Sequence, residues 1–201
     1  MKVILIHGIH SPEKNNNISR LKPALERAMP GVEIEIFSYG FMGFWAARWD
    51  NSKIAQKFSD AICEAKEKHD KVVVISHSNG AAITYLAVNE FDADPDMVIQ
   101  INPALDKHRT PVVKWVEVIH SNQDRAVELA QWLPFNIWGN QGKVGYQGKR
   151  KNTINHNAST FDKYMRYDDH VGLFESSKIG MWARFIASRI QGMLQTEHAD
   201  I

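Results

Sequence analysis

Ser78 is the strongest candidate for a nucleophile in this chain. It is the central residue of Ser76-His77-Ser78-Asn79-Gly80, which follows the apolar run 72–75. A strand that ends in a tight turn and passes directly into a helix holds its central serine above the sheet, where the hydroxyl can attack a substrate. The residues two before and two after that serine must be small. Gly80 meets this condition, and Ser76 is a sterically mild departure from glycine. The alternative is a serine that only caps the following helix.

Short apolar runs and amphipathic stretches alternate along the chain and must position this serine. The runs are mostly continuous, which is typical of strands buried on both faces of a parallel sheet. We expect strands at 3–6, 32–37, 72–75, 97–101 and 112–119. Apolar residues at helical spacing predict helices at 18–28, 54–65, 79–90, 126–132 and 175–195. The first helix is expected to be capped by Asn16 or Asn17. This order predicts an α/β fold with a doubly wound, mostly parallel sheet flanked by helices, in one domain over residues 1–201.

With the turn at 76–80 and the strand end His7-Gly8, the chain resembles the α/β-hydrolase superfamily, as a small lipase- or esterase-like member. The resemblance extends over nearly the whole chain. It implies that nucleophile, acid and histidine follow in this order at the carboxyl ends of successive strands. Many relatives insert a cap domain where this chain has only the ten residues 102–111. We therefore expect little or no cap and an open cleft above Ser78.

The resemblance places the acid and the base in the second half of the chain. A serine hydroxyl is a weak nucleophile until a histidine takes its proton and a carboxylate orients that histidine. Asp124, in the polar turn after the strand at 112–119, is the predicted acid, although a carboxylate there would also suit the start of a helix. Asp106 is its rival. His170, just before the last helix, is the predicted base, and His156, after a short strand near 152–154, is the runner-up.

Two backbone N–H groups are expected to stabilise the oxyanion that forms when Ser78 attacks. The resemblance implies that Ile9, directly after His7-Gly8, supplies one of them. Asn79 supplies the other at the start of a helix, where the helix dipole adds to its effect.

Three further residues are predicted to contact substrate: His10, Phe41 and Trp45. An exposed loop histidine is the simpler interpretation of the first. The aromatic segment 40–45 and Trp49 would line an acyl pocket or form a flap, or would simply be the apolar face of a short helix. The Gly-spaced stretch 132–150 is expected to be a long loop beside the site. The basic cluster at 149–151 would suit an anionic group, although a solvated run of charge explains it as well.

Composition excludes several other classes. The 201 residues include 24 basic and 23 acidic ones, for a net charge of +1, which argues against a protein built mainly to bind nucleic acid. The single cysteine, Cys63, excludes an intramolecular disulfide and a four-cysteine zinc site. No apolar run approaches the roughly 18 residues of a membrane span. The four apolar residues at 3–6 are too few for a secretory signal, so we expect a cytoplasmic protein.

Together these patterns predict a serine hydrolase that cleaves carboxylic esters through Ser78, His170 and Asp124 by way of an acyl-enzyme. The expected substrate is a small-molecule or lipid-like ester, and the chemistry needs no metal or organic cofactor. The same residues would serve a thioesterase or an acyltransferase. A protein that kept the fold but only binds a partner is the alternative of another class, because Ser76 departs from glycine and several aromatic side chains are expected at the surface. The oligomeric state is left open.

Overall fold

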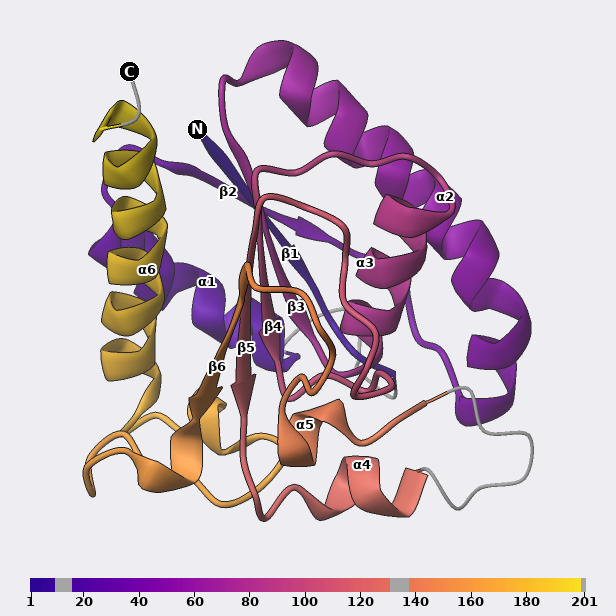
Figure 1. Ribbon diagram of the computed structural model, residues 1–201, viewed down its shortest axis with the longest axis vertical. Helices are drawn as coiled ribbons and strands as arrows, with labels where there is room; N and C mark the ends of the chain where they lie inside the picture. Colours follow the sequence, from indigo (N-terminus) through magenta and orange to yellow (C-terminus); the bar gives the residue numbers. More distant parts are fainter. Residues whose placement is uncertain (10–15, 131–137, 200–201) are drawn as a thin grey trace.

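The computed structural model describes residues 1–9, 16–130 and 138–199, without the side chains of residues 44, 130 and 197–199. Six parallel strands form one sheet in the order β2-β1-β3-β4-β5-β6 (Figure 1). The strands are β1 (Lys2–Ile6), β2 (Glu33–Phe37), β3 (Val72–His77), β4 (Met97–Ile101), β5 (Trp115–His120) and β6 (Thr153–Asn157). The helices are α1 (Asn17–Ala28), α2 (Phe44–Lys68), α3 (Asn79–Asn89), α4 (Arg125–Ala130), α5 (Gln141–Val144) and α6 (Ile179–Ala199). The predicted doubly wound α/β sheet is confirmed.

Helices cover both faces of the sheet because each strand sends alternate side chains to opposite sides. On one face, α1 and α6 pack their apolar stripes on the strands, with Ile18 of α1, Trp182 and Ile186 of α6 and Leu5 of β1 in one cluster. Figure 1 shows these two helices together on one side of the sheet and α2 and α3 on the other. The central strand β3 is buried along its whole length, which explains its continuous apolar run.

The opposite face carries the second core. Phe58 and Ile62 of α2 pack there with Ile83 and Ala87 of α3 and with Ile4 of β1, the strand neighbour of Leu5. Val72 and Val74 of β3 belong to the same cluster, so the two helices also cover the strand that leads to Ser78. Since all strands run in parallel, their carboxyl ends share one edge of the sheet, where α4 and α5 also lie (Figure 1). In open α/β sheets that edge is the usual place for a ligand.

Several boundaries differ from the predicted ones. The helix expected from residue 54 begins at Phe44, so Trp45 and Trp49 lie in the first turns of α2, whereas Phe41 precedes the helix. The strand expected from residue 112 begins at Trp115, because Val112 lies at the surface, 61% exposed. In the stretch expected to be a long loop, residues 141–144 form α5. Asn16 caps α1, as one of the two predicted alternatives: its Oδ1 accepts a 2.8 Å hydrogen bond from Ser19 N.

The structure also bears on the expected lack of a cap domain and on membrane-spanning helices. Residues 102–114, between β4 and β5, hold no helix or strand, in agreement with the expected lack of a cap at this point. In the part of the chain that the structure describes, no helix combines the length and apolar character that a membrane span requires.

Candidate active site

Ser78 connects β3 to α3 in an unusual backbone conformation. Its φ is 55° and its ψ is −123°, a region that costs a residue other than glycine about 1–3 kcal/mol. The surrounding backbone maintains it: Ser78 N donates to Ile101 O at 3.1 Å, and Ser78 O accepts from Ala81 N at 3.0 Å and Ala104 N at 3.1 Å. The side chain makes no capping hydrogen bond to α3. The helix-cap alternative therefore does not describe this serine, whose hydroxyl is left for other partners.

The turn at Ser78 depends on close backbone approach at Gly80. A Cβ there would lie 2.7 Å from His7 O and 2.8 Å from Ile6 O, so no side chain fits between α3 and β1. Ser76 is tolerated on the other side of the turn, fully buried, with its hydroxyl donating to Ile99 O at 3.4 Å. The size condition read from the sequence is thus explained by the packing of α3 on the end of β1.

Gly8 has the same role directly above the serine. A Cβ at this position would lie 2.8 Å from Ser78 Cβ and 3.1 Å from Ser78 Oγ. We expect Gly8→Ala to displace the hydroxyl and to lower kcat on an ester by about 100-fold, since a displacement near 1 Å at a reacting group costs about that much. Steady-state kinetics on p-nitrophenyl acetate, with a melting curve, measures it. Gly180→Ala is the control, because a Cβ there meets nothing within 4 Å. An unchanged kcat in Gly8→Ala would contradict the proposed reacting position of Ser78.

The structure brings Asp124 and His170 together. Asp124 Oδ2 lies 2.8 Å from His170 Nδ1, with the carboxylate fully buried and the imidazole side chain 18% exposed. Asp124 Oδ1 accepts from Val127 N at 3.2 Å, so the same carboxylate also caps α4. The carboxylate therefore contacts His170 through one oxygen and caps α4 through the other. With Nδ1 bonded to the carboxylate, Nε2 is the ring nitrogen available to a serine hydroxyl.

The rival acid and base lie elsewhere. Asp106 is exposed, and its carboxylate accepts from His108 N at 2.8 Å in its own loop. His156 on β6 hydrogen bonds through Nε2 to Glu117 of β5, which also pairs with Arg189 of α6 at 2.8 Å. His156 therefore belongs to an ion-pair cluster between β5, β6 and α6.

Three buried polar residues that the sequence did not single out hold the His170 loop. Asn102, at the end of β4, donates from Nδ2 to the carbonyls of His170 at 2.8 Å and Asp169 at 3.2 Å. Its Oδ1 accepts from Tyr167 OH at 3.0 Å. His77, next to Ser78, places Nε2 3.2 Å from the His170 carbonyl and its ring 4.9 Å from the His170 ring. These contacts determine where the imidazole lies, and no local sequence pattern marks them.

Burial lowers the pKa of His77 to about 3, with a further contribution from the nearby His170. The unfolded side chain takes up a proton below about pH 6.5, so between pH 6.5 and 3 the unfolded state binds more protons than the folded one. The free energy of unfolding should therefore fall by up to about 1.4 kcal/mol per pH unit as the pH decreases through this window. Urea unfolding at several pH values measures the slope. His77→Gln keeps an N–H donor without a titrating ring, and an undiminished slope in that variant would assign the acid sensitivity to other groups.

Ser78 and His170 line the same small cavity, of about 150 Å³. The two residues predicted to supply oxyanion donors, Ile9 and Asn79, line it too. Among the described residues, its remaining lining is mostly apolar and consists of Ala104, Ala126, Val127 and Trp138. The nucleophile candidate, the base candidate and both backbone donors thus meet at one place, as the order of strands requires.

A buried amide network surrounds Asn79. Asn79 and Asn51 of α2 exchange side-chain hydrogen bonds of 2.9 and 3.0 Å, and Trp138 Nε1 donates to Asn79 Oδ1 at 2.6 Å. Tyr39 also lies nearby, donating to the His7 carbonyl at 2.8 Å, and burial raises the pKa of its phenol. Two residues far apart in the sequence, Asn51 and Trp138, therefore hold the side chain of the residue that follows Ser78.

The structure does not place the predicted substrate contacts in this cavity. Phe41 and Trp45 are each 68% exposed and do not line it, and Trp49 is 71% exposed. His10 lies outside the described residues. Trp45 and Trp49 thus lie on the outer surface of the first turns of α2, and Phe41 is exposed just before the helix. These three side chains form neither an acyl pocket nor the apolar core face of a helix.

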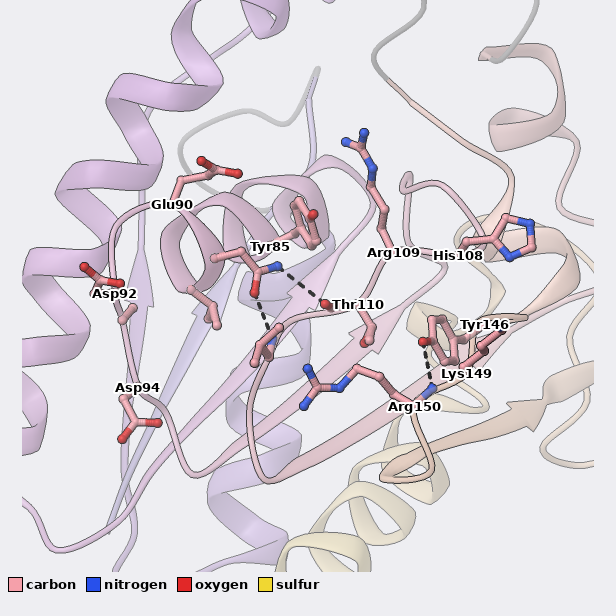
Figure 2. Close-up of a pocket in the computed structure, with 14 residues that line it drawn as sticks. Tyr85, Glu90, Asp92, Asp94, His108, Arg109, Thr110, Tyr146, Lys149 and Arg150 are labelled. Carbon is pink, nitrogen blue, oxygen red and sulfur yellow. Dashed lines mark hydrogen bonds between the residues drawn. The ribbon is translucent and has the colours of Figure 1, made fainter.

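A larger and more open cavity, of about 830 Å³, lies at the other end of α3 (Figure 2). It contains none of Ser78, Asp124 and His170. Carboxylates of Glu90, Asp92 and Asp94 lie at the left of Figure 2, and the guanidinium groups of Arg109 and Arg150 lie near its centre. The larger volume of this cavity therefore does not identify it as the reactive site. Of the basic cluster at 149–151, Lys149 and Arg150 line this cavity and not the one that contains Ser78.

Among the described residues, no three side chains of His, Cys, Asp or Glu are grouped so as to hold a metal ion.

Comparisons with known proteins agree with the architecture. No family model matches the chain, and no curated protein matches it in sequence. Solved structures do match. Est1E from Butyrivibrio proteoclasticus, seen with bound ferulic acid, has a TM-score of 0.63 at 15% sequence identity. The match covers 96% of this chain and 89% of the Est1E chain. The thioesterase RedJ of prodiginine biosynthesis in Streptomyces coelicolor has a TM-score of 0.59 at 11% identity, covering 93% and 84%.

An extracellular α/β-hydrolase from a Paenibacillus species has a TM-score of 0.58 at 11% identity, covering 94% of this chain and 98% of its own. Identities this low carry the fold alone. The likeness nevertheless extends over almost the whole chain and over most of each neighbour. Together with the parallel sheet and its helices on both faces, it shows that this is a small protein of the α/β-hydrolase fold.

Proposed function

We propose that this protein is a serine hydrolase that cleaves carboxylic esters, with Ser78 as nucleophile, His170 as base and Asp124 as the acid that orients it. One observation carries the proposal. The fully buried Asp124 hydrogen bonds to His170 at 2.8 Å, and His170 lines one cavity with a serine of positive φ. Positioned groups of this kind are what nucleophilic catalysis by a serine requires.

The first half of the reaction forms an acyl-enzyme. Ser78 Oγ attacks the acyl carbon of the ester while its proton passes to His170 Nε2. The N–H groups of Ile9 and Asn79 stabilise the negative charge on the former carbonyl oxygen, a contribution of about 3–4 kcal/mol for one such donor. The bond between the acyl carbon and the alcohol oxygen then breaks, and the alcohol takes the proton from His170.

The second half regenerates the serine. A water molecule gives a proton to His170 Nε2 and attacks the acyl carbon, and Ser78 leaves with that proton as the carboxylic acid departs. The departing alcohol of the first half must lie beside His170. A groove of about 400 Å³ adjoins this histidine, and its lining includes Gln123, Arg125 and Asp168. This groove is the natural place for the leaving group.

Labelling with a fluorophosphonate tests the proposal. The probe reacts only with an activated serine, so we expect one covalent adduct on the Ser78 peptide by mass spectrometry and none in Ser78→Ala. Turnover of p-nitrophenyl acetate and of an acetyl thioester, measured side by side, then separates ester from thioester cleavage. The thioester arm is included because one of the structural neighbours is a thioesterase.

The absence of an adduct on folded protein, together with no turnover of either substrate, would overturn the proposal. It would favour a protein that keeps the fold only for binding. An adduct on another serine would retain hydrolysis but reject Ser78.

A further inference from the structure

Trp138 lies between two cavities. It lines the cavity of about 150 Å³ that contains Ser78, and it also lines a second one of about 530 Å³. The second cavity lies along α2 and α3, where Asn51, Ala82 and Tyr85 contribute to its lining. The indole is therefore a common wall, with the candidate nucleophile on one side and a larger space on the other.

Hydrogen bonds hold this wall in place. Trp138 is 8% exposed, and its Nε1 donates to Asn79 Oδ1 at 2.6 Å. Asn79 is itself bonded in both directions to Asn51, which lines the far cavity, whereas Asn79 lines the near one. A side chain with its polar atom satisfied and its ring buried does not swing aside without loss of these contacts. Trp138 is consequently a fixed part of the lining of the near cavity.

The mechanism determines which part of the ester faces this wall. The leaving alcohol must receive its proton from His170, and the groove of about 400 Å³ shares His170 and Ala126 with the near cavity. The acyl group points away from the alcohol across the attacked carbon. It therefore extends into the near cavity, toward Ala104, Val127 and Trp138.

We propose that Trp138 sets the acyl length and that the substrates are esters of short acyl groups. This inference rests on the proposed function. Sites that enclose drug-sized ligands have about 300–1,000 Å³, well above the near cavity. An apolar cavity of about 150 Å³ holds a molecule as large as benzene, which corresponds to acyl groups of up to about six carbon atoms. The second cavity is the space that a longer chain would need and that the indole denies it.

The test is the acyl-length profile of kcat/KM on p-nitrophenyl acetate, butyrate, octanoate and dodecanoate. Wild type should prefer acetate and butyrate and cleave octanoate at least about 10-fold less efficiently, given the 10- to 200-fold effect of a single misfitting methylene. Trp138→Ala should raise the octanoate-to-butyrate ratio by about 10-fold, because the two cavities become one. Trp138→Phe keeps the bulk but loses the N–H, so it should retain the wild-type ratio even if kcat falls. Trp49→Ala is the matched control at an exposed tryptophan and should leave the ratio unchanged.

Two results would overturn the inference: equal cleavage of butyrate and dodecanoate by wild type, or an unchanged ratio in folded Trp138→Ala. If Trp138→Ala does not fold, labelling of wild-type Ser78 by ethyl and dodecyl fluorophosphonates decides, with equal rates contradicting a short cavity and a slower dodecyl probe supporting it. Failure of the proposed function is distinguishable from these results, since it removes labelling and turnover at every chain length.

Discussion

Replacing Ser78 with alanine should lower kcat on p-nitrophenyl acetate by about 10⁶-fold, to the level that binding and the oxyanion donors alone provide. The size of the effect follows from the loss of the only attacking atom. Since the residues act as a unit, adding His170→Ala to Ser78→Ala should cost almost nothing further. Kinetics on the two single variants and the double variant measures both statements.

Ser76→Ala is the matched control for this experiment. Ser76 is fully buried two residues before Ser78, and its hydroxyl contacts Ile99 O, away from the candidate active-site cavity. Its replacement should leave kcat within a few-fold of wild type. Equal losses in Ser76→Ala and Ser78→Ala would indicate a folding defect, and a double variant much slower than Ser78→Ala would show that His170 does not act through Ser78.

Replacing Asp124 with asparagine should lower kcat by about 10⁴-fold, the second largest effect. Asparagine keeps nearly the same volume, and its Oδ1 still accepts from Val127 N, so α4 keeps its cap. The amide that replaces Oδ2 is a donor, however, and it favours the imidazole tautomer with its proton on Nε2. That tautomer cannot take the proton of Ser78. Kinetics together with a thermal melt separates this loss from unfolding.

Asp106→Asn and His156→Gln are the matched controls, since these residues were the rival acid and base. Neither lies in the cavity with Ser78. We expect Asp106→Asn to leave kcat and stability close to wild type, because the carboxylate is exposed. His156→Gln should act on stability through the buried Glu117 and leave kcat nearly unchanged. A large kcat loss in Asp106→Asn with a small one in Asp124→Asn would reverse the assignment of the acid.

Local patterns in the sequence determined the framework. The continuous apolar run at 72–75 predicted a strand buried on both faces, and the small residue at position 80 predicted a close approach of chain segments after it. Both features depend on side-chain size and hydrophobicity at neighbouring positions, which a sequence displays directly. The same holds for the cap at Asn16, whose partner is three residues away.

Two features of the helices were not predicted, each for its own physical reason: the early start of α2 and the presence of α5. Trp45 and Trp49 have exposed side chains in the first turns of α2, so these positions do not show the core-facing apolar pattern that marks the rest of the helix. The short α5 lies in a Gly-containing stretch, where local propensity is weak and packing against β5 decides.

What only the tertiary structure decided is which polar groups become partners. Asp124 and His170 are 46 residues apart, Tyr167 and Asn102 are 65 apart, and His77 and His170 are 93 apart. Such contacts arise because parallel strands bring their carboxyl ends to one edge, whatever their separation along the chain. The sequence by itself therefore determined the α/β architecture and singled out Ser78, Asp124 and His170 as candidates. The packing of distant loops at that edge selected Asp124 over Asp106 as the partner of His170, and it placed Trp138 beside Ser78.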